Sequence, residues 1–306
     1  MAIITRYPGS LGRIRPVRLL SGGFNFLRRW PIIPGLILGV LVISAIFAEW
    51  VAPHDYRDQD LRLRHAPPVF MEGGTSERIL GADRVGRDIL SRLVHGARLS
   101  IVVAAVSLVS GGILGTGLGV MAGWHAGERQ SRWLIDEIIM RMVDIWFAVP
   151  FLLLALVVVI RFDPSLKIVL ILLAMLSWSG FVRNVRAEVL VIKNRDYIAL
   201  AQVAGASTTR LIARHLLPGV INTVLVIASL QVGGLILAEA SLSFLGAGIP
   251  SPTPAWGVMV SDGRNYLHLA WWESTFPGVA ILLVVMSYNF VGDWLRDRFD
   301  PRLRQI

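Results

Sequence analysis

The sequence contains 306 residues, of which 54% are hydrophobic, and its mean hydropathy is +0.61. Ordinary soluble domains contain about 45–50% apolar residues, so the bilayer is the first candidate for the solvent of this chain. Cysteine is absent, which excludes disulfides, zinc–thiolate sites and thiol nucleophiles. The net charge of +9 raises the question of nucleic acid binding, which the positions of the basic residues decide.

Apolar stretches predict six membrane-spanning helices, because a spanning helix needs about 20 apolar residues. These stretches are residues 32–51, 99–123, 145–160, 168–182, 219–245 and 276–291. The third, fourth and sixth are shorter than an ideal span, so each alone is also compatible with a buried or re-entrant segment. Six spans place both ends of the chain on the same side of the membrane.

Lysine and arginine are concentrated in alternate connecting segments. Nineteen of the 30 lie in the N-terminal tail 1–31, the second and fourth loops, and the C-terminal tail 293–306. Eight more lie in the long segment 52–98, which also carries seven acidic residues and has little weight in a positive-inside count. The pattern predicts a multi-pass membrane protein with both termini cytoplasmic, and no nucleic acid partner.

The first apolar stretch, 32–51, is interpreted as a retained span rather than a signal peptide. It is about 20 residues long instead of 7–15, and no A-x-A cleavage motif follows it. The extracytoplasmic segment 52–98 then follows, and the expected transmembrane core occupies residues 99–292, including a cytoplasmic loop at 183–218.

The end of segment 52–98 has helical periodicity. From Asp83, a candidate N-cap, apolar residues recur at helical spacing and charged residues occupy the other side. We expect an amphipathic helix on the outer membrane surface; a solvated connector is the alternative. The apolar positions are Val85, Ile89, Leu93 and Ala97, and the polar positions are Arg84, Arg87, Asp88, Ser91 and Arg98.

The second span carries four glycines in one four-residue register: Gly111, Gly115, Gly119 and Gly123. In lipid, such a groove lets two helix backbones approach and pack by dispersion. We expect a close helix contact at this groove, within this chain in preference to another subunit.

The fourth loop, 183–218, is polar enough to leave the membrane but keeps helical periodicity. Ile198, Ala201, Val203 and Ala204 predict the apolar side of a short helix. Gly205 is expected to end this helix, Ser207 to cap a second one, and Pro218 to begin the next span. A helix–turn–helix of this kind is typical of a docking device; a surface hairpin packed only on its own bundle is the alternative.

This loop resembles the EAA loop of ABC importer permeases. Residues 196–207, followed by Arg214-His215-Leu216-Leu217-Pro218, match its pattern at Ala201, Gly205, Leu217 and Pro218. The match fails at Ala199, where the usual residue is glutamate, at Leu200 and at His215, which leaves one polar contact with an ATPase in doubt. The resemblance implies ATPase coupling through Asp196, Ala199, Ala201, Gly205, Ala206, Ser207, Leu217 and Pro218.

From about residue 30 to 303 the chain resembles the C-type permease subunit of dipeptide and oligopeptide importers. The matching motifs include Gly81-x-Asp83-x-x-Gly86-Arg87-Asp88-x-x-Ser91-Arg92, Met140-Arg141-x-Val143-Asp144, residues 238–246, Trp256-Gly257, Asp262-Gly263-Arg264, Trp271-Trp272, Phe276-Pro277-Gly278 and Gly292-Asp293-x-Leu295-Arg296-Asp297-x-x-Asp300-Pro301. The first of these is an extracytoplasmic motif of the family.

The resemblance implies an all-α, six-helix type I permease that works by alternating access. Its implied partners are a homologous B-type permease, two ATP-binding subunits that carry ATP and magnesium, and an extracytoplasmic solute-binding protein, with membrane lipid around the complex. Peptides are the implied solute; nickel chelates, glutathione or another small solute are alternatives.

The chain itself lacks the motifs of an ATPase or hydrolase. Its only lysines, Lys167 and Lys193, do not follow a glycine as in a phosphate-binding loop, and no zinc-type histidine motif or nucleophile elbow is present. We therefore expect no catalytic residue, metal site or cofactor on this chain. A secondary transporter and a membrane scaffold are the rival readings.

One carboxylate, Glu239, lies well inside an apolar span, where an unpaired charge is costly. It is a candidate for the lining of the translocation path, or equally a partner for donors at a helix end. Trp178 and Asn289 are weaker candidates for the same path.

Overall fold

The computed structural model describes residues 31–127 and 133–299, and every regular element in these stretches is helical. The expected N-terminal tail up to residue 30 and residues 300–306 of the C-terminal tail lie outside the described residues. The helices are α2 (Ile32–Ile46), α3 (Ala48–Val51), α4 (Ile89–His125), α5 (Trp133–Ala148), α6 (Phe151–Phe162), α7 (Leu166–Lys193), α8 (Asp196–Val203), α9 (Thr208–Leu211), α10 (Leu217–Phe244), α11 (Trp256–Gly263) and α12 (Trp272–Phe299). Three short turns complete the list: 3₁₀ turns at Leu61–Leu63 and Arg264–Tyr266, and a π-helical turn at Ile212–Leu216.

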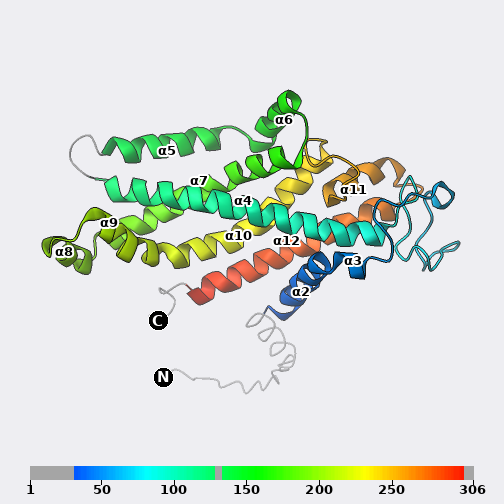
Figure 1. Ribbon diagram of the computed structural model, residues 1–306, viewed down its shortest axis with the longest axis horizontal. Coiled ribbons are helices and arrows are strands. Elements are labelled where there is room, and N and C mark those ends of the chain that lie inside the picture. Colours follow the sequence, from blue (N-terminus) through cyan, green and yellow to red (C-terminus); the bar gives the residue numbers. More distant parts are fainter. Residues whose placement is uncertain (1–30, 128–132, 300–306) are drawn as a thin grey trace, which may run out of the picture.

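The long helices form one elongated bundle. Figure 1 shows α4, α7, α10 and α12 running along its length, with α8 and α9 at one end and α11 at the other. We call these the hairpin end and the α11 end. Helix α2 packs against α4 and α12, while α5 lies along α4 at the opposite edge of the bundle.

Four helical stretches are long and apolar enough to cross a membrane: Ile89–His125, Leu166–Lys193, Thr208–Phe244 and Trp272–Arg298. A fifth passes this test only as a pair, because α5 and α6 are bent by 84° at the break between them. Helix α2 has 15 residues, fewer than the roughly 20 of an ideal span.

The third apolar stretch, 145–160, was predicted as a short span with a buried or re-entrant segment as the alternative, and the structure breaks the helix inside it. Pro150 lies at the N-cap of α6 in an extended conformation. Proline cannot donate to the preceding turn, and it also drives the residue before it away from helical geometry. The fourth span was predicted too short, since α7 continues as one helix to Lys193. The sixth likewise continues past 292 to the end of α12.

The segment before α4 also differs from expectation. The helix begins at Ile89, and its N-cap is Asp88, whose carboxylate accepts the backbone N–H of Ser91 at 2.8 Å. Residues 82–88 form a turn instead, in which Gly86 has φ +79° and lies against the carbonyl of Asp60. No separate amphipathic helix is present here, because residues 89–98 are the first part of α4. The alternative prediction of a solvated connector was wrong as well, because the charged side chains of this turn are largely buried.

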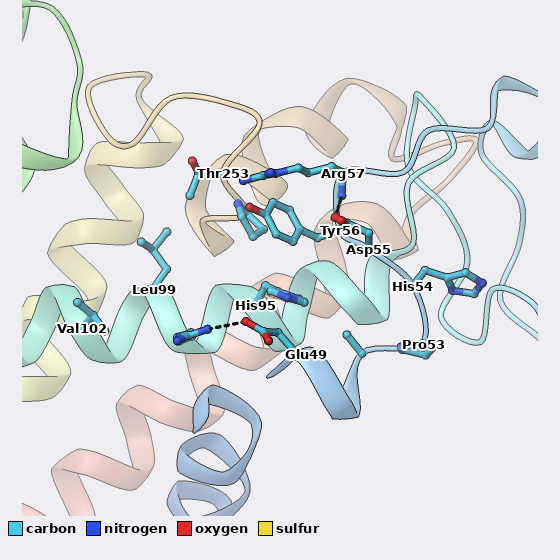
Figure 2. A pocket seen from close by; sticks show the side chains of 13 residues that line it. Glu49, Pro53, His54, Asp55, Tyr56, Arg57, His95, Leu99, Val102 and Thr253 are labelled. Atoms are coloured by element: carbon cyan, nitrogen blue, oxygen red, sulfur yellow. Dashed lines mark hydrogen bonds and ion pairs between the residues drawn. The ribbon is translucent and has the colours of Figure 1, made fainter. Parts of the chain in front are cut away.

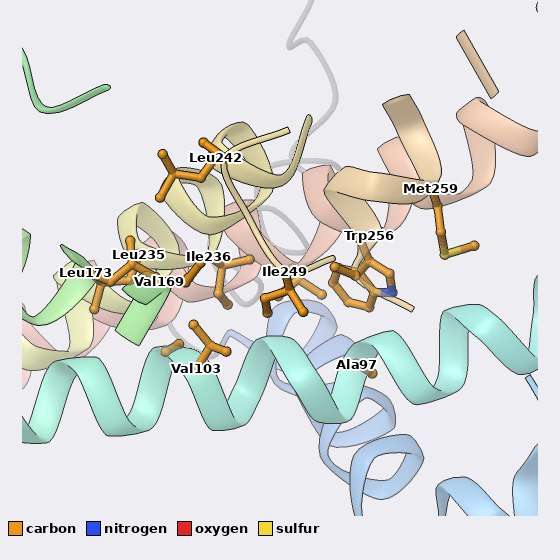
Figure 3. Packing of buried hydrophobic residues seen from close by; sticks show 14 of the residues in the cluster. Ala97, Val103, Val169, Leu173, Leu235, Ile236, Leu242, Ile249, Trp256 and Met259 are labelled. Carbon is orange, nitrogen blue, oxygen red and sulfur yellow. The ribbon is translucent and has the colours of Figure 1, made fainter. Parts of the chain in front are cut away.

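The main apolar core joins α4, α7, α10 and α11. Figure 3 shows Val103 of α4 facing Ile236 of α10, and Trp256 of α11 lying above Ala97. The indole of Trp256 donates to the carbonyl of Leu93 at 3.0 Å, which fixes α11 on the first turns of α4. This core therefore lies toward the α11 end of the bundle.

The glycine register of α4 lies against α7 of the same chain. A Cβ at Gly115 would meet the carbonyl of Trp178, and would lie 2.7 Å from Cβ of Phe181. A Cβ at Gly111 would likewise meet Ser177, and a Cβ at Gly119 would meet Val185. The two parallel helices thus approach at backbone distance along their shared length.

Gly115→Ala is therefore expected to destabilise the bundle by about 1–3 kcal/mol, the usual cost of overpacking a close contact. Gly117→Ala is the matched control, because no atom lies within 4 Å of its would-be Cβ and alanine favours the helix. Thermal unfolding of the purified protein in detergent measures both. Equal melting temperatures of the two variants would contradict the close packing.

Candidate functional site

The hairpin between α7 and α10 is a rigid projection at one end of the bundle. Helix α8 ends at Val203, the chain turns at Gly205 with φ +82°, and α9 begins after Ser207, whose hydroxyl accepts the N–H of Arg210. Glycine suits this turn because an L side chain is strained at positive φ. The predicted order of helix, glycine turn and capped helix is present.

The hairpin is anchored by one apolar cluster. Ile198 of α8, Leu211 of α9 and Leu216 are buried against Trp124 of α4 and Val189 of α7. The ammonium of Lys193 donates to the carbonyls of Trp124 and Ala126, which ties the end of α7 to the end of α4. The two helices are therefore packed on the bundle and do not form a loose loop.

The other side of α8 is apolar and uncovered. Val203 is 88% exposed and Leu200 is 69% exposed. The predicted single apolar side was thus wrong in part, because Ile198 faces the bundle whereas Val203 and Ala204 point away from it. Two apolar faces need two partners, and the bundle covers only one of them.

The remaining predicted loop residues lie around this uncovered side. Asp196, Ala199 and Ser207 are exposed, while Ala201 and Ala206 are half-buried toward the anchor. Leu217 and Pro218 do not begin a separate helix, because α9 passes through the π-helical turn into α10 without a break. Pro218 lies two residues after that turn and has no N–H to donate to a preceding carbonyl.

The α11 end contains a buried cluster of charges. The carboxylate of Asp83 accepts from Nε of Arg87 at 2.7 Å and from the guanidinium of Arg92. It also accepts the backbone N–H groups of Val85 and Arg87 at 3.0 Å. Asp262 of α11 lies 3.8 Å from Arg87, so the cluster links the turn before α4 to α11. The motif residues therefore act together as a structural joint.

A second polar joint lies beside the first. His65 Nδ1 and a carboxylate oxygen of Glu273 are 2.5 Å apart, and the indole of Trp272 donates to the carbonyl of Ala82 at 3.3 Å. Gly81, with φ +83°, lies against this same indole. Together the two joints connect segment 52–88 to the start of α12.

Asp83 gives this end of the protein a defined response to acid. Burial opposes ionisation of its carboxyl, but Arg92, Arg87 and two backbone N–H groups outweigh burial and hold its pKa below the ordinary value. A depressed folded-state pKa stabilises the fold above the unfolded-state pKa, and this stabilisation is lost as pH falls through the folded value. Wild type should therefore lose its advantage in melting temperature over Asp83→Asn as pH falls from 7 to below about 4. A gap that stays constant with pH would contradict this assignment.

The three candidates for the translocation path are not brought together. Glu239 is buried, one oxygen accepts from Ser243 Oγ at 2.7 Å, and the other has no partner. Trp178 is buried between α7 and α5, where its ring lies 6.3 Å from that of Trp146. Asn289 of α12 is exposed and lies over Gly233 of α10. No group of three or more His, Asp or Glu side chains could hold a metal within residues 31–127 and 133–299.

The fold and the hairpin can now be compared with known proteins. Residues 115–305 match the family described as the binding-protein-dependent transport system inner membrane component, and residues 31–68 match the N-terminal transmembrane domain of oligopeptide transport permease C. The chain belongs to this transport family. It is a membrane-embedded permease subunit of a binding-protein-dependent ABC importer.

Named relatives of this permease cover nearly its full length. It is 45% identical over 281 residues to the dipeptide transport system permease protein DppC of Escherichia coli K12, covering 92% of each chain. It is 41% identical over 269 residues to the di/tripeptide permease DppC of Pseudomonas aeruginosa, covering 88% of this chain and 87% of that one. The glutathione permease GsiD of Pectobacterium atrosepticum is 38% identical, covering 92% and 90%.

The fold itself is also found in a solved transporter. A chain of the MetNI methionine ABC transporter in an inward-facing conformation has a TM-score of 0.57 and 20% identity, and the match covers 69% of this permease and 97% of that chain. This similarity supports the fold class, an all-helical type I permease.

A hollow of about 770 Å³ lies at the α11 end of the permease. Figure 2 shows it between the end of α3, the first turns of α4 and the loop around Thr253. Glu49 and Arg98 form an ion pair of 3.5 Å at its edge, and the rings of Tyr56 and His95 lie 4.7 Å apart. This hollow could not be predicted from local patterns, because its lining comes from three separate segments.

Two ion pairs between α5 and α7 were also not predicted from the sequence. Arg186 makes a bidentate contact with Asp136 at 2.5 and 2.7 Å, and Arg183 donates to Asp144 at 2.8 Å. The one available signal was the position of these charged residues beside apolar runs at helical spacing, because charges in such positions need a partner in the bundle.

Proposed function

We propose that this permease moves dipeptides or short oligopeptides across the cytoplasmic membrane of a bacterium. The support is the identity of 41–45% to relatives that are named for dipeptide or di/tripeptide transport. A relative named for glutathione transport is 38% identical, so a glutathione-like peptide is the second candidate solute. Nickel chelates remain an alternative with no support among these relatives. The family assignment favours the importer over a secondary transporter or a scaffold.

We further propose that α2, the bent pair α5 and α6, and the four long helices make six crossings. The hairpin end then faces the cytoplasm together with both termini, in agreement with the distribution of Lys and Arg. The α11 end faces outward, where a solute-binding protein delivers the peptide.

The hairpin carries the proposed mechanism. Its exposed apolar side, centred on Val203 and Leu200, docks into a cleft of a separate ATP-binding subunit, and its buried side is fixed to α4 and α7. Closure of two such subunits around ATP and magnesium then rotates the helices as rigid bodies and alternates access to the path. A homologous B-type permease completes the complex. This chain contributes no catalytic group, and the missing glutamate at Ala199 makes the apolar contact the main one.

Uptake of radiolabelled alanyl-alanine tests the proposed solute. A strain that lacks this permease should lose uptake, and the plasmid-borne gene should restore it, whereas glutathione uptake should change little. Loss and recovery of glutathione uptake alone would move the assignment to the second candidate. Unchanged uptake of both would contradict a peptide importer.

A further inference from the structure

The exposed surface of α5 has two chemically different sectors. Glu137, Arg141 and Asp144 are spaced by four and three residues, so they share one face of the helix. A second exposed sector is entirely apolar: Leu134, Ile138, Met142 and Ile145. One environment cannot suit both sectors. The apolar sector fits lipid, and the charged sector needs water or a polar partner.

The charged sector of α5 lies at the same height in the bundle as apolar parts of α4 and α7. Arg183, the partner of Asp144, is flanked on α7 by Val182 and Val185, which contact Gly119 of α4. Helix α4 has no charged side chain between Arg98 and His125. Charged groups at such a depth are costly against hydrocarbon and therefore face a wet cavity or another chain.

The two ion pairs differ in their exposure. Asp136 and Arg186 are mostly covered, with side chains 15% and 27% exposed. Asp144 and Arg183 are 51% and 45% exposed, and the guanidinium of Arg183 lies 4.3 Å from the ring centre of Phe147. The first pair holds α5 to α7. The second pair exposes one negative and one positive group side by side on the surface of the bundle.

We propose that Asp144 and Arg183 line the translocation path and bind the two charged ends of the transported peptide. This inference rests on the proposed function, because a free dipeptide carries one ammonium and one carboxylate group. The hydrogen bond between the two side chains uses one N–H of Arg183 and one oxygen of Asp144. A guanidinium has five N–H donors and a carboxylate has two oxygens, so both can hold a ligand without leaving each other.

The first test asks whether the charged sector is wet. The chain has no cysteine, so single cysteines can be introduced without background. In membrane vesicles with the assembled importer, Arg141→Cys should react with a charged methanethiosulfonate reagent at least ten times faster than Met142→Cys, its neighbour in the apolar sector. Equal rates would overturn the proposal.

The second test separates peptide handling from folding. In the importer reconstituted with its binding protein, Arg183→Gln and Asp144→Asn should keep stimulated ATP hydrolysis and lower alanyl-alanine uptake per ATP at least tenfold. Arg183→Lys, which keeps the charge, should recover part of the uptake. Glu49→Gln, which removes an exposed ion pair at the other end of the protein, is the matched control and should match wild type.

The outcomes distinguish this site from the function on which it rests. If the wild-type importer takes up alanyl-alanine and both neutralised variants have the same uptake per ATP as wild type, the site alone would be overturned. Absence of alanyl-alanine uptake by the wild-type importer would overturn the site and the peptide function together.

Discussion

Gly205→Glu is expected to reduce peptide uptake to background while the protein still inserts into the membrane at normal abundance. The turn at Gly205 has φ +82°, which costs an L residue roughly 1–2 kcal/mol. No atom lies within 4 Å of its would-be Cβ, so the substitution causes no clash within the bundle. In the proposed docking, the new carboxylate instead lies at the contact between the hairpin and the ATP-binding subunit. Uptake of alanyl-alanine and quantification of the protein in purified membranes measure the two effects.

Gly205→Asn separates backbone strain from docking. Asparagine tolerates positive φ better than other non-glycine residues, so this variant should keep most of its uptake. Gly205→Glu with normal uptake at normal abundance would contradict the docking assignment. Failure of both variants to reach the membrane would assign the glycine to folding instead.

Asp83→Ala is expected to have the largest effect on stability. It leaves the buried guanidinium groups of Arg87 and Arg92 without their shared carboxylate, and breaking a buried pair from one side costs about 3–5 kcal/mol. This is a large part of the usual stability of a folded protein. We expect strongly reduced abundance in the membrane and a lower melting temperature in detergent.

Arg84→Ala is the matched control for the cluster. Arg84 lies 3.3 Å from Asp262, but its side chain is 44% exposed, so the loss should stay within about 1 kcal/mol. If Asp83→Ala were as stable as Arg84→Ala, the cluster would not be the structural joint between the turn, α4 and α11.

Local chemistry was enough to predict the hairpin. Gly205 and Ser207 specify their own turn and cap, so the order of helix, turn and helix could be read from a few neighbouring residues. The direction of Val203 could not be predicted in the same way. Its neighbours are also apolar, and only the position of Trp124 and Val189 decides which side of α8 is covered.

The charged segment before α4 shows the opposite case. Helical periodicity at Val85 and Ile89 predicted a surface helix, but the Asp83 carboxylate uses two backbone N–H groups to form a turn. Tertiary packing brings Asp262 of α11 to Arg87, and the burial of Arg87 and Arg92 around the Asp83 carboxylate cannot be seen in a local pattern. For the same reason, the partners of Arg183 and Arg186 on α5 were not predictable.

The apolar pattern located membrane helices but not their ends. The uncharged stretch of α7 ends at Val182 and underestimates the helix, which continues because Arg183 and Arg186 have carboxylate partners on α5. The break at Pro150 was visible as a residue, yet apolar residues on both sides concealed its effect on the span.

Docking of the hairpin on an ATP-binding subunit is tested most directly by crosslinking from Val203. A single cysteine at Val203, in a chain that otherwise has none, can carry a maleimide photo-crosslinker in native membranes. We expect an adduct with an ATP-binding subunit from Val203, and no such adduct from a cysteine at Leu61 near the α11 end. An adduct only from Leu61, or none from Val203 at normal abundance, would contradict it.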